Sequence, residues 1–227
     1  IKNLTKSRSK SIMSSSIMDW SSVEIARQLT LIEFALFENI QVKECLNENW
    51  SKQDGDMAPN LNAIIQRSNL VVYFVAHEVL KLTSSASARA HAIQKWIKVA
   101  RECRKINNFN ACREIVGGLR TIPVSRLDQT WGKVDPKLKK EFDELVELVS
   151  QKKNYKNMRA ALSSCPPPCL PYVGTTLQDL TFINEGNKDL VPNTNAKPST
   201  KDENPHAPYQ PQLINFFKRQ KIGVVIR

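Results

Sequence analysis

Apolar residues recur along most of the chain at the three- and four-residue spacing that is typical of amphipathic helices. The first stripe follows the segment SSVE at 21–24, which fits a capping box because a hydroxyl stands three residues before a carboxylate. The pattern therefore predicts a helix that begins close to residue 22. Its inward-facing positions are expected to be Ile25, Leu29, Ile32, Leu36 and Ile40.

Later stripes predict further helices over about 61–82, 93–103, 112–119, 136–149 and 155–162. After a proline-rich break at 166–171, a helical segment is expected at 174–185, a polar stretch at 188–211 and an apolar-basic helix from 213. Alternating strand patterns are hard to find. We therefore expect an all-α fold: a single irregular helical domain with one core over 21–227.

Composition supports a folded, helical chain. Of 227 residues, 41% are apolar, which is enough to bury a core, and only 7 are glycine, which favours helices over hairpins and phosphate loops. No run of 18 apolar residues occurs, so no segment is expected to span a membrane. The formal net charge of +11 suggests an anionic partner without naming it.

The first twenty residues are basic and rich in serine, and they read as a flexible arm. Residues 1–18 contribute +4 to the net charge. Further basic residues lie at 137–140, 152–156 and 218–227. The positive charge would suit a helical nucleic-acid-binding module, although the basic residues gather in no single stretch. We expect no nucleic acid among the partners.

Motifs for covalent chemistry are absent from the sequence. The 5 cysteines and 3 histidines form no zinc-site spacing and are expected to be reduced thiols and ordinary side chains of a cytoplasmic protein. No phosphate-binding loop, metalloprotease motif or nucleophile elbow occurs, and Gly117-Gly118 is interpreted as a helix end. We expect no cofactor and no metal, and any catalysis must work through binding and distortion.

Six blocks resemble, in order and spacing, the Cdc25-homology catalytic domain of Ras-family guanine-nucleotide exchange factors, most closely the Son-of-sevenless type. They are EIARQLTLIEFALFENI (24–40), APNLNAII (58–65), INNFNACREIVGGL (106–119), IPVSRLDQTW (122–131), PPPCLPYVGTTLQDLTFINEGN (166–187) and LINFFKRQK (213–221). The resemblance implies a helical bowl that grips a Ras-family small GTPase, preferably nucleotide-free. A helical hairpin, at about 174–222, would open the switch and Mg²⁺/phosphate region of that GTPase.

The resemblance also implies roles for single residues. Glu185 would reach the phosphate and Mg²⁺ site of the GTPase, and Thr181, one turn earlier, would face the metal. Thr181 is smaller and more polar than the apolar residue of Son-of-sevenless. GTPase contacts are implied for Gln66 or Arg67, and for Arg113, Arg120, Tyr155, Gln178, Phe182, Asn187 and Lys221.

Three departures leave a second interpretation open. The stretch 188–211 is longer than the family's usual connection and fits a disordered insertion; the chain stops at GVVIR, where relatives continue; and no N-terminal helical module is seen. Thr181, the long stretch and the missing end leave a catalytically weak module that binds a GTPase without opening it as the alternative, and the lack of an N-terminal module predicts lower activity or stability of the isolated domain. Peripheral contact with anionic lipid, with recruitment from the cytoplasm to the inner membrane surface, is a further expectation from the charge.

Overall fold

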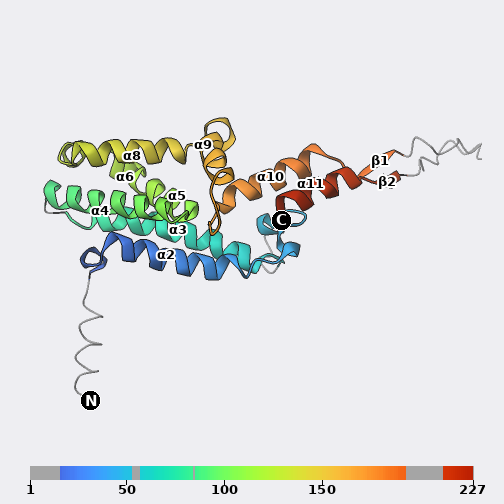
Figure 1. The fold of residues 1–227 in the computed structure, drawn as a ribbon, viewed down its shortest axis with the longest axis horizontal. Coiled ribbons are helices and arrows are strands. Elements are labelled where there is room, and N and C mark those ends of the chain that lie inside the picture. The colour runs from blue at the N-terminus through green and yellow to red at the C-terminus, as the bar shows by residue number, and fades with distance from the viewer. Residues whose placement is uncertain (1–15, 53–56, 84, 193–211, 227) are drawn as a thin grey trace, which may run out of the picture. The chain divides into compact units, whose positions relative to one another are not determined.

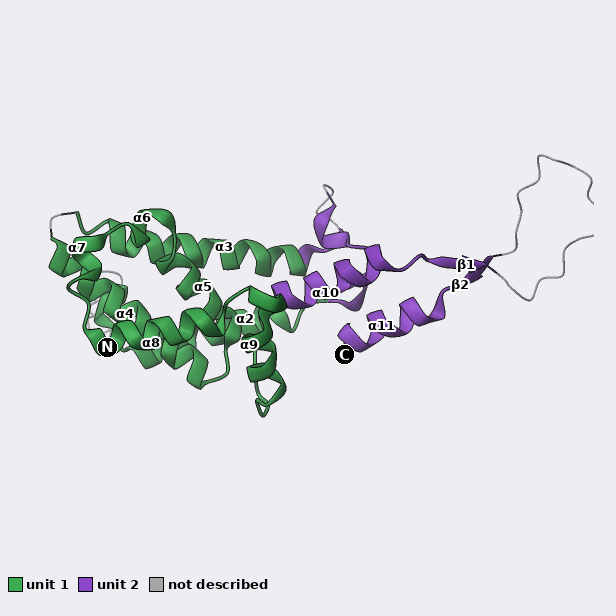
Figure 2. Ribbon diagram, turned by 90° about the horizontal axis from the view of Figure 1, so that it is seen from above, with its two compact units in different colours: residues 1–40, 60–172 green, residues 41–59, 173–227 purple. Residues whose placement is uncertain are grey.

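The computed structural model describes residues 16–52, 57–83, 85–192 and 212–226. Over these residues it consists of α-helices, a few short 3-10 helices and one two-stranded sheet (Figure 1). The predicted all-α fold is confirmed. The chain divides into two compact units, one formed by residues 1–40 and 60–172 and the other by 41–59 and 173–227 (Figure 2).

The first unit is a stack of helices around α4 (Ala86–Lys105), which packs against four of its neighbours. Figure 1 shows α4 between α2 and α8. The α-helices of this unit besides α4 are α2 (Ser22–Phe37), α3 (Pro59–Leu80), α5 (Phe109–Leu119), α6 (Ile122–Ser125), α7 (Asp128–Trp131), α8 (Pro136–Leu148) and α9 (Lys152–Ser163).

The predicted apolar face of α4 is confirmed, because Ile93, Trp96, Ile97, Ala100 and Cys103 are all buried in the core of the first unit. The start of α8 is also as predicted. The Asp135 carboxylate accepts hydrogen bonds from the backbone N–H groups of residues 137 and 138, at 2.8 and 3.2 Å, and Pro136 occupies the first helical position.

Helix α2 begins at Ser22 as predicted, and the Ser21 hydroxyl accepts a hydrogen bond from the Glu24 N–H at 3.0 Å. One predicted core position in α2 is wrong. Ile32 is 47% exposed, whereas the next residue, Glu33, is 1% exposed. A polar partner explains the reversal: Glu33 Oε2 accepts a hydrogen bond from Asn108 Nδ2 at 2.9 Å, and that partner lies 75 residues away in sequence.

The interpretation of Gly117-Gly118 as a helix end agrees with the structure, since both glycines lie in the last turn of α5, which ends at Leu119. A Cβ atom at Gly118 would stand 2.7 Å from the backbone oxygen of Val72 and 2.7 Å from Val75 Cβ. Gly118 is therefore a point of close approach between α5 and α3, and the missing side chain permits that approach.

Of the arm predicted over residues 1–20, residues 1–15 lie outside the described part. Residues 17–19 form the short 3-10 helix η1 (Ile17–Asp19), capped by the Ser16 hydroxyl. Ile17 and Met18 pack against the core of the first unit, and Lys95 Nζ donates a hydrogen bond to the Trp20 backbone oxygen.

The second unit holds a helical hairpin. Helix α10 (Val173–Gly186) leads into strand β1 (Leu190–Pro192), which pairs antiparallel with β2 (Gln212–Ile214) before α11 (Phe216–Ile226) begins. The ladder pairs Leu190 with Ile214 and Pro192 with Gln212, so α11 runs back along α10. Two short 3-10 helices, η2 (Val42–Cys45) and η3 (Asn49–Ser51), complete the unit.

Within the predicted insertion at 188–211, the first five residues belong to this hairpin and residues 193–211 lie outside the described part. The sequence pattern gave no sign of β1 and β2, because neither three-residue strand has a buried side chain that would produce an alternating pattern.

Candidate functional site

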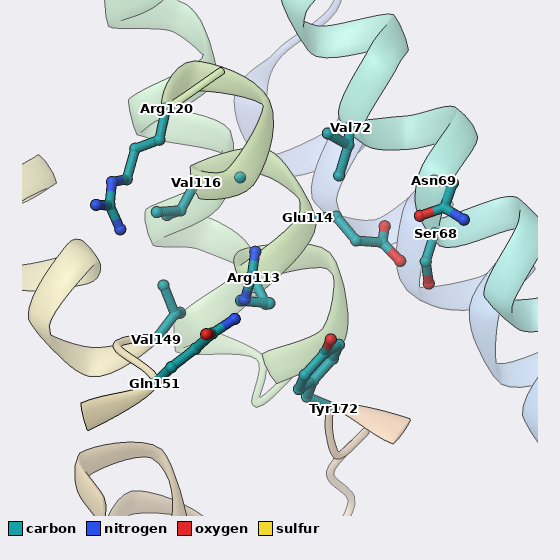
Figure 3. A pocket seen from close by; sticks show the side chains of 11 residues that line it. Ser68, Asn69, Val72, Arg113, Glu114, Val116, Arg120, Val149, Gln151 and Tyr172 are labelled. Carbon is teal, nitrogen blue, oxygen red and sulfur yellow. The ribbon is translucent and has the colours of Figure 1, made fainter. Parts of the chain in front are cut away.

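The surface of the first unit carries a pocket of about 410 Å³ between α3 and α5 (Figure 3). Its lining comes from α3, from α5, and from the segments that follow α8 and α9. We call it the α3–α5 pocket, and its lining residues are Ser68, Asn69, Val72, Arg113, Glu114, Val116, Gly117, Arg120, Val149, Gln151 and Tyr172.

Arg113 provides the central positive charge of the α3–α5 pocket. Its guanidinium carbon lies 5.6 Å from the centre of the Tyr172 ring, within the range of a cation–π contact. Gly117 leaves the space that the guanidinium occupies, since a Cβ atom there would stand 2.9 Å from Arg113 Nη1. The buried Nε of Arg113 has no hydrogen-bond partner among the described residues. A second guanidinium, that of the exposed Arg120, also borders the pocket.

The one carboxyl group in the pocket lining belongs to Glu114, which is 2% exposed. Its Oε1 accepts a hydrogen bond from Asn110 Nδ2 at 2.6 Å. Burial raises the pKa of Glu114, while a hydrogen bond with Ser68 opposes this shift. In Figure 3 the Glu114 carboxylate turns toward Ser68, and Arg113 lies on the side of Gln151.

Beneath the pocket, Asn108 joins α2 to α5. Its Oδ1 accepts a hydrogen bond from the Ala111 N–H at 2.9 Å and so caps α5, and its Nδ2 donates to Thr30 Oγ1 and to Glu33 Oε2, each at 2.9 Å. Asn108 therefore has a structural role. Burial, followed by the negative charge of Glu114, raises the pKa of Glu33 to about 8.

The structure brings only some of the predicted GTPase-contacting residues together. Arg113 and Arg120 share the α3–α5 pocket, whereas Gln66 and Arg67 lie on α3 outside its lining. Gln66 is exposed and Arg67 is half-buried.

Tyr155 is 8% exposed, and its ring packs 5.8 Å from the ring of Tyr172. The backbone at residues 153–155 has φ values of 51° to 56°, and this left-handed turn directs Tyr155 inward. Tyr155 therefore meets the pocket through Tyr172, which sequence reasoning did not single out although it lies within the PPPCLPYVG block.

The predicted residues on α10 lie on one face of the helix, because positions 178, 181, 182 and 185 follow helical spacing. Glu185 is exposed in the last turn, Phe182 is 53% exposed, and Gln178 and Thr181 are half-buried. Asn187 donates a hydrogen bond from Nδ2 to the Ile183 oxygen at 2.8 Å, which satisfies one carbonyl at the end of the helix. On α11, Lys221 Nζ lies 4.2 Å from the centre of the Phe217 ring.

A buried lysine, which sequence reasoning missed, fixes the last turn of α10. Lys218 is 1% exposed, and its Nζ donates to the Asn184 backbone oxygen at 3.2 Å and lies 3.1 Å from Asp189 Oδ1. Asn184 in turn donates from Nδ2 to Glu48 Oε1 at 2.6 Å. These hydrogen bonds fix the position of Asn184, which immediately precedes Glu185.

Among the described residues, no group of three or more histidine, cysteine, aspartate and glutamate side chains could hold a metal ion. In the same part of the chain, no helix combines the length and the apolar character that a membrane span needs.

A family model described as the RasGEF domain matches residues 24–220. The chain belongs to the RasGEF domain family. The resemblance drawn from the six sequence blocks is thereby confirmed.

Named relatives agree with this assignment. The RasGEF domain is 40% identical over 183 residues to Ras guanine nucleotide exchange factor M of Dictyostelium discoideum, covering 80% of this chain and 20% of that protein. It is 46% identical over 177 residues to Ras guanine nucleotide exchange factor E of the same organism, covering 76% of this chain and 17% of that protein. It is 35% identical over 208 residues to Ras-specific guanine nucleotide-releasing factor 1 of Rattus norvegicus, covering 91% of this chain and 15% of that protein. The chain thus spans a fifth or less of the length of these relatives.

Proposed function

We propose that this RasGEF domain promotes the release of GDP from a Ras-family small GTPase. The observation that carries the proposal is the match of the RasGEF domain over residues 24–220, which includes both the α3–α5 pocket and α10. The names of the relatives, which are Ras exchange or releasing factors, point to the same class of partner.

The proposed mechanism is differential binding without covalent chemistry. A protein that binds the nucleotide-free GTPase more tightly than the loaded form must weaken nucleotide binding by the same factor, because the two binding equilibria are linked. The first unit would grip the GTPase through the surface around the α3–α5 pocket. The hairpin of α10 and α11 would open the switch region next to the nucleotide.

Glu185 is the residue to which we assign the displacement of nucleotide. Its carboxylate is exposed in the last turn of α10, and a negative charge placed at a phosphate site repels phosphate and occupies the donors that hold it. Thr181 lies one turn earlier on the same face and would crowd the Mg²⁺ site less than a larger apolar side chain. The charge of Glu185 is therefore expected to contribute more to release than the volume of Thr181.

Recruitment to the inner membrane surface is a second part of the proposal. Lys152, Lys153 and Lys156 are exposed around the start of α9, and each lysine close to an anionic bilayer contributes about 1 kcal/mol of attraction. We infer a cytoplasmic protein that binds anionic lipid weakly, with an affinity that falls as salt rises.

The test is release of a fluorescent guanine nucleotide from Ras, Rap and Ral GTPases, with and without this chain. Acceleration on at least one of them is expected. If the chain binds a nucleotide-free GTPase and leaves the release rate unchanged, it is a GTPase-binding module without exchange activity. If it neither binds nor accelerates any member of the panel, the proposed function is wrong.

A further inference from the structure

We propose that the α3–α5 pocket accepts an acidic side chain of the GTPase, and that Arg113 selects partners that carry a carboxylate at that place. The inference rests on the proposed function and goes further, because it names the chemistry that the pocket recognises. It depends on the charge, the space and the unused hydrogen-bonding capacity around Arg113.

The guanidinium of Arg113 is held in place within the pocket and has unused hydrogen-bonding capacity. Its guanidinium is positioned by the Tyr172 ring at 5.6 Å and by the space above Gly117, yet its buried Nε has no partner in the described part of the chain. A buried donor without a partner is unfavourable. Arg113 as a whole is half-buried, so a turn of its guanidinium would let an incoming carboxylate accept a charge-assisted hydrogen bond from it.

The pocket lining contains more cationic than acidic side chains. Arg113 and Arg120 are its two cationic side chains, and no salt bridge within the described residues joins either to a carboxylate. The one acidic side chain in the lining, Glu114, is 2% exposed; its Oε1 accepts a hydrogen bond from Asn110, and its carboxylate turns toward α3. The pocket is therefore positive toward a partner.

The pocket combines its cationic groups with apolar walls. Val72, Val116 and Val149 provide apolar walls around the two guanidinium groups, and the pocket volume is about 410 Å³. This lining suits a protein segment in which an acidic side chain stands beside an apolar one. A phosphate group would gain little from the three valines, so a peptide carboxylate is the occupant to which we commit.

The experiment measures initial rates of nucleotide release over a range of GTPase concentrations, so that kcat and KM are separated. Arg113→Met keeps the length of the side chain and removes its charge. We expect KM to rise about tenfold or more with kcat changed less than twofold, since losing a hydrogen bond to a charged group weakens binding by roughly 10- to 100-fold. Lys98→Met, on the exposed side of α4, removes the same charge elsewhere and is expected to leave both constants unchanged.

Gly117→Ala provides a second variant that keeps the charge. The added Cβ would displace the Arg113 guanidinium, and alanine is better than glycine for the stability of α5. We expect a several-fold rise in KM with an unchanged or higher melting temperature. A loss of binding in this variant therefore cannot be explained by unfolding.

The partner's carboxylate is found by a double-mutant cycle. Each acidic residue in the second switch segment of the GTPase is changed to its amide, and each change is tested against wild-type protein and Arg113→Met. We expect one acid whose change raises KM with the wild type and has no further effect with Arg113→Met. If Arg113→Met leaves KM unchanged while the wild type is active, the acidic-ligand proposal is wrong and the exchange function stands. If the wild type neither binds nor accelerates any GTPase, both are wrong.

Discussion

Lys218 places its ammonium group 3.1 Å from the carboxylate of Asp189, although the lysine is 1% exposed. The same ammonium group donates a hydrogen bond to the Asn184 backbone oxygen at 3.2 Å. A positive side chain at the last turn of a helix satisfies a free carbonyl and interacts favourably with the helix dipole. The pair therefore ties α11 to the end of α10, immediately before Glu185.

The first prediction is that Lys218→Met loosens the hairpin. Methionine fills a similar volume but leaves the Asn184 oxygen without its donor, and we expect a loss of roughly 1 to 3 kcal/mol in local stability. Hydrogen exchange of the α10 and α11 amides measures this loss. Lys188→Met, at an exposed lysine beside the same turn, is the control and is expected to leave exchange unchanged. If the α10 and α11 amides are equally protected from exchange in both variants, Lys218 does not stabilise the hairpin.

The second prediction concerns pH. The pKa of Glu33 is raised to about 8 by burial and by the charge of Glu114, so the folded state binds a proton that the unfolded state releases near its ordinary value of 4.5. The free energy of unfolding must therefore fall as pH rises between these values, with the loss complete above pH 8. We expect a decrease of at least about 1 kcal/mol between pH 6 and pH 8.5, measured by urea unfolding.

Glu33→Gln is the matched variant for this pH effect. The amide oxygen of glutamine can still accept the hydrogen bond from Asn108, and glutamine does not ionise. We expect the difference in stability between pH 6 and pH 8.5 to shrink in this variant. A wild-type protein whose stability does not change over this range would contradict the assignment.

The third prediction separates the two adjacent glycines of α5. Gly118→Ala should lower stability by roughly 1 to 3 kcal/mol, because its Cβ would meet the Val72 backbone oxygen at 2.7 Å and that oxygen cannot move aside alone. Gly117→Ala should not lower stability, since its Cβ would meet Nη1 at the flexible end of the Arg113 side chain. Thermal unfolding of the two variants provides the comparison. A Gly118→Ala protein as stable as the wild type would mean that α5 can shift away from α3.

The fourth prediction concerns exchange. Glu185→Gln should slow nucleotide release by roughly 10- to 100-fold with little change in KM, because the exposed carboxylate supplies charge and not packing. Its circular dichroism and melting temperature should match those of the wild type. Arg113→Met is expected to raise KM with little change in kcat, whereas Glu185→Gln is expected to lower kcat with little change in KM. Full activity in the Glu185→Gln protein would remove Glu185 from the mechanism.

Much of the fold could be predicted because helices leave a local record in sequence. The buried face of α4 and the start of α8 at residue 136 depend on residues within a few turns of one another, so local sequence patterns were sufficient. The prediction failed at Ile32 and Glu33, where the burial of a carboxyl group depends on Asn108 of another helix. Periodicity alone predicted Ile32 as the buried residue because it contains no information about such a partner.

For the candidate site, too, some features follow from the sequence and others only from the folded structure. The sequence by itself determined the helices, the family blocks and the helical spacing that aligns Thr181 with Glu185. Only the tertiary structure decided that Arg113 lies over Gly117 against Tyr172, that Tyr155 is turned inward, and that Lys218 is buried beside Asp189. The physical reason is that helix formation is governed by neighbours in sequence, whereas the environment of a charge is set by groups that only folding brings together.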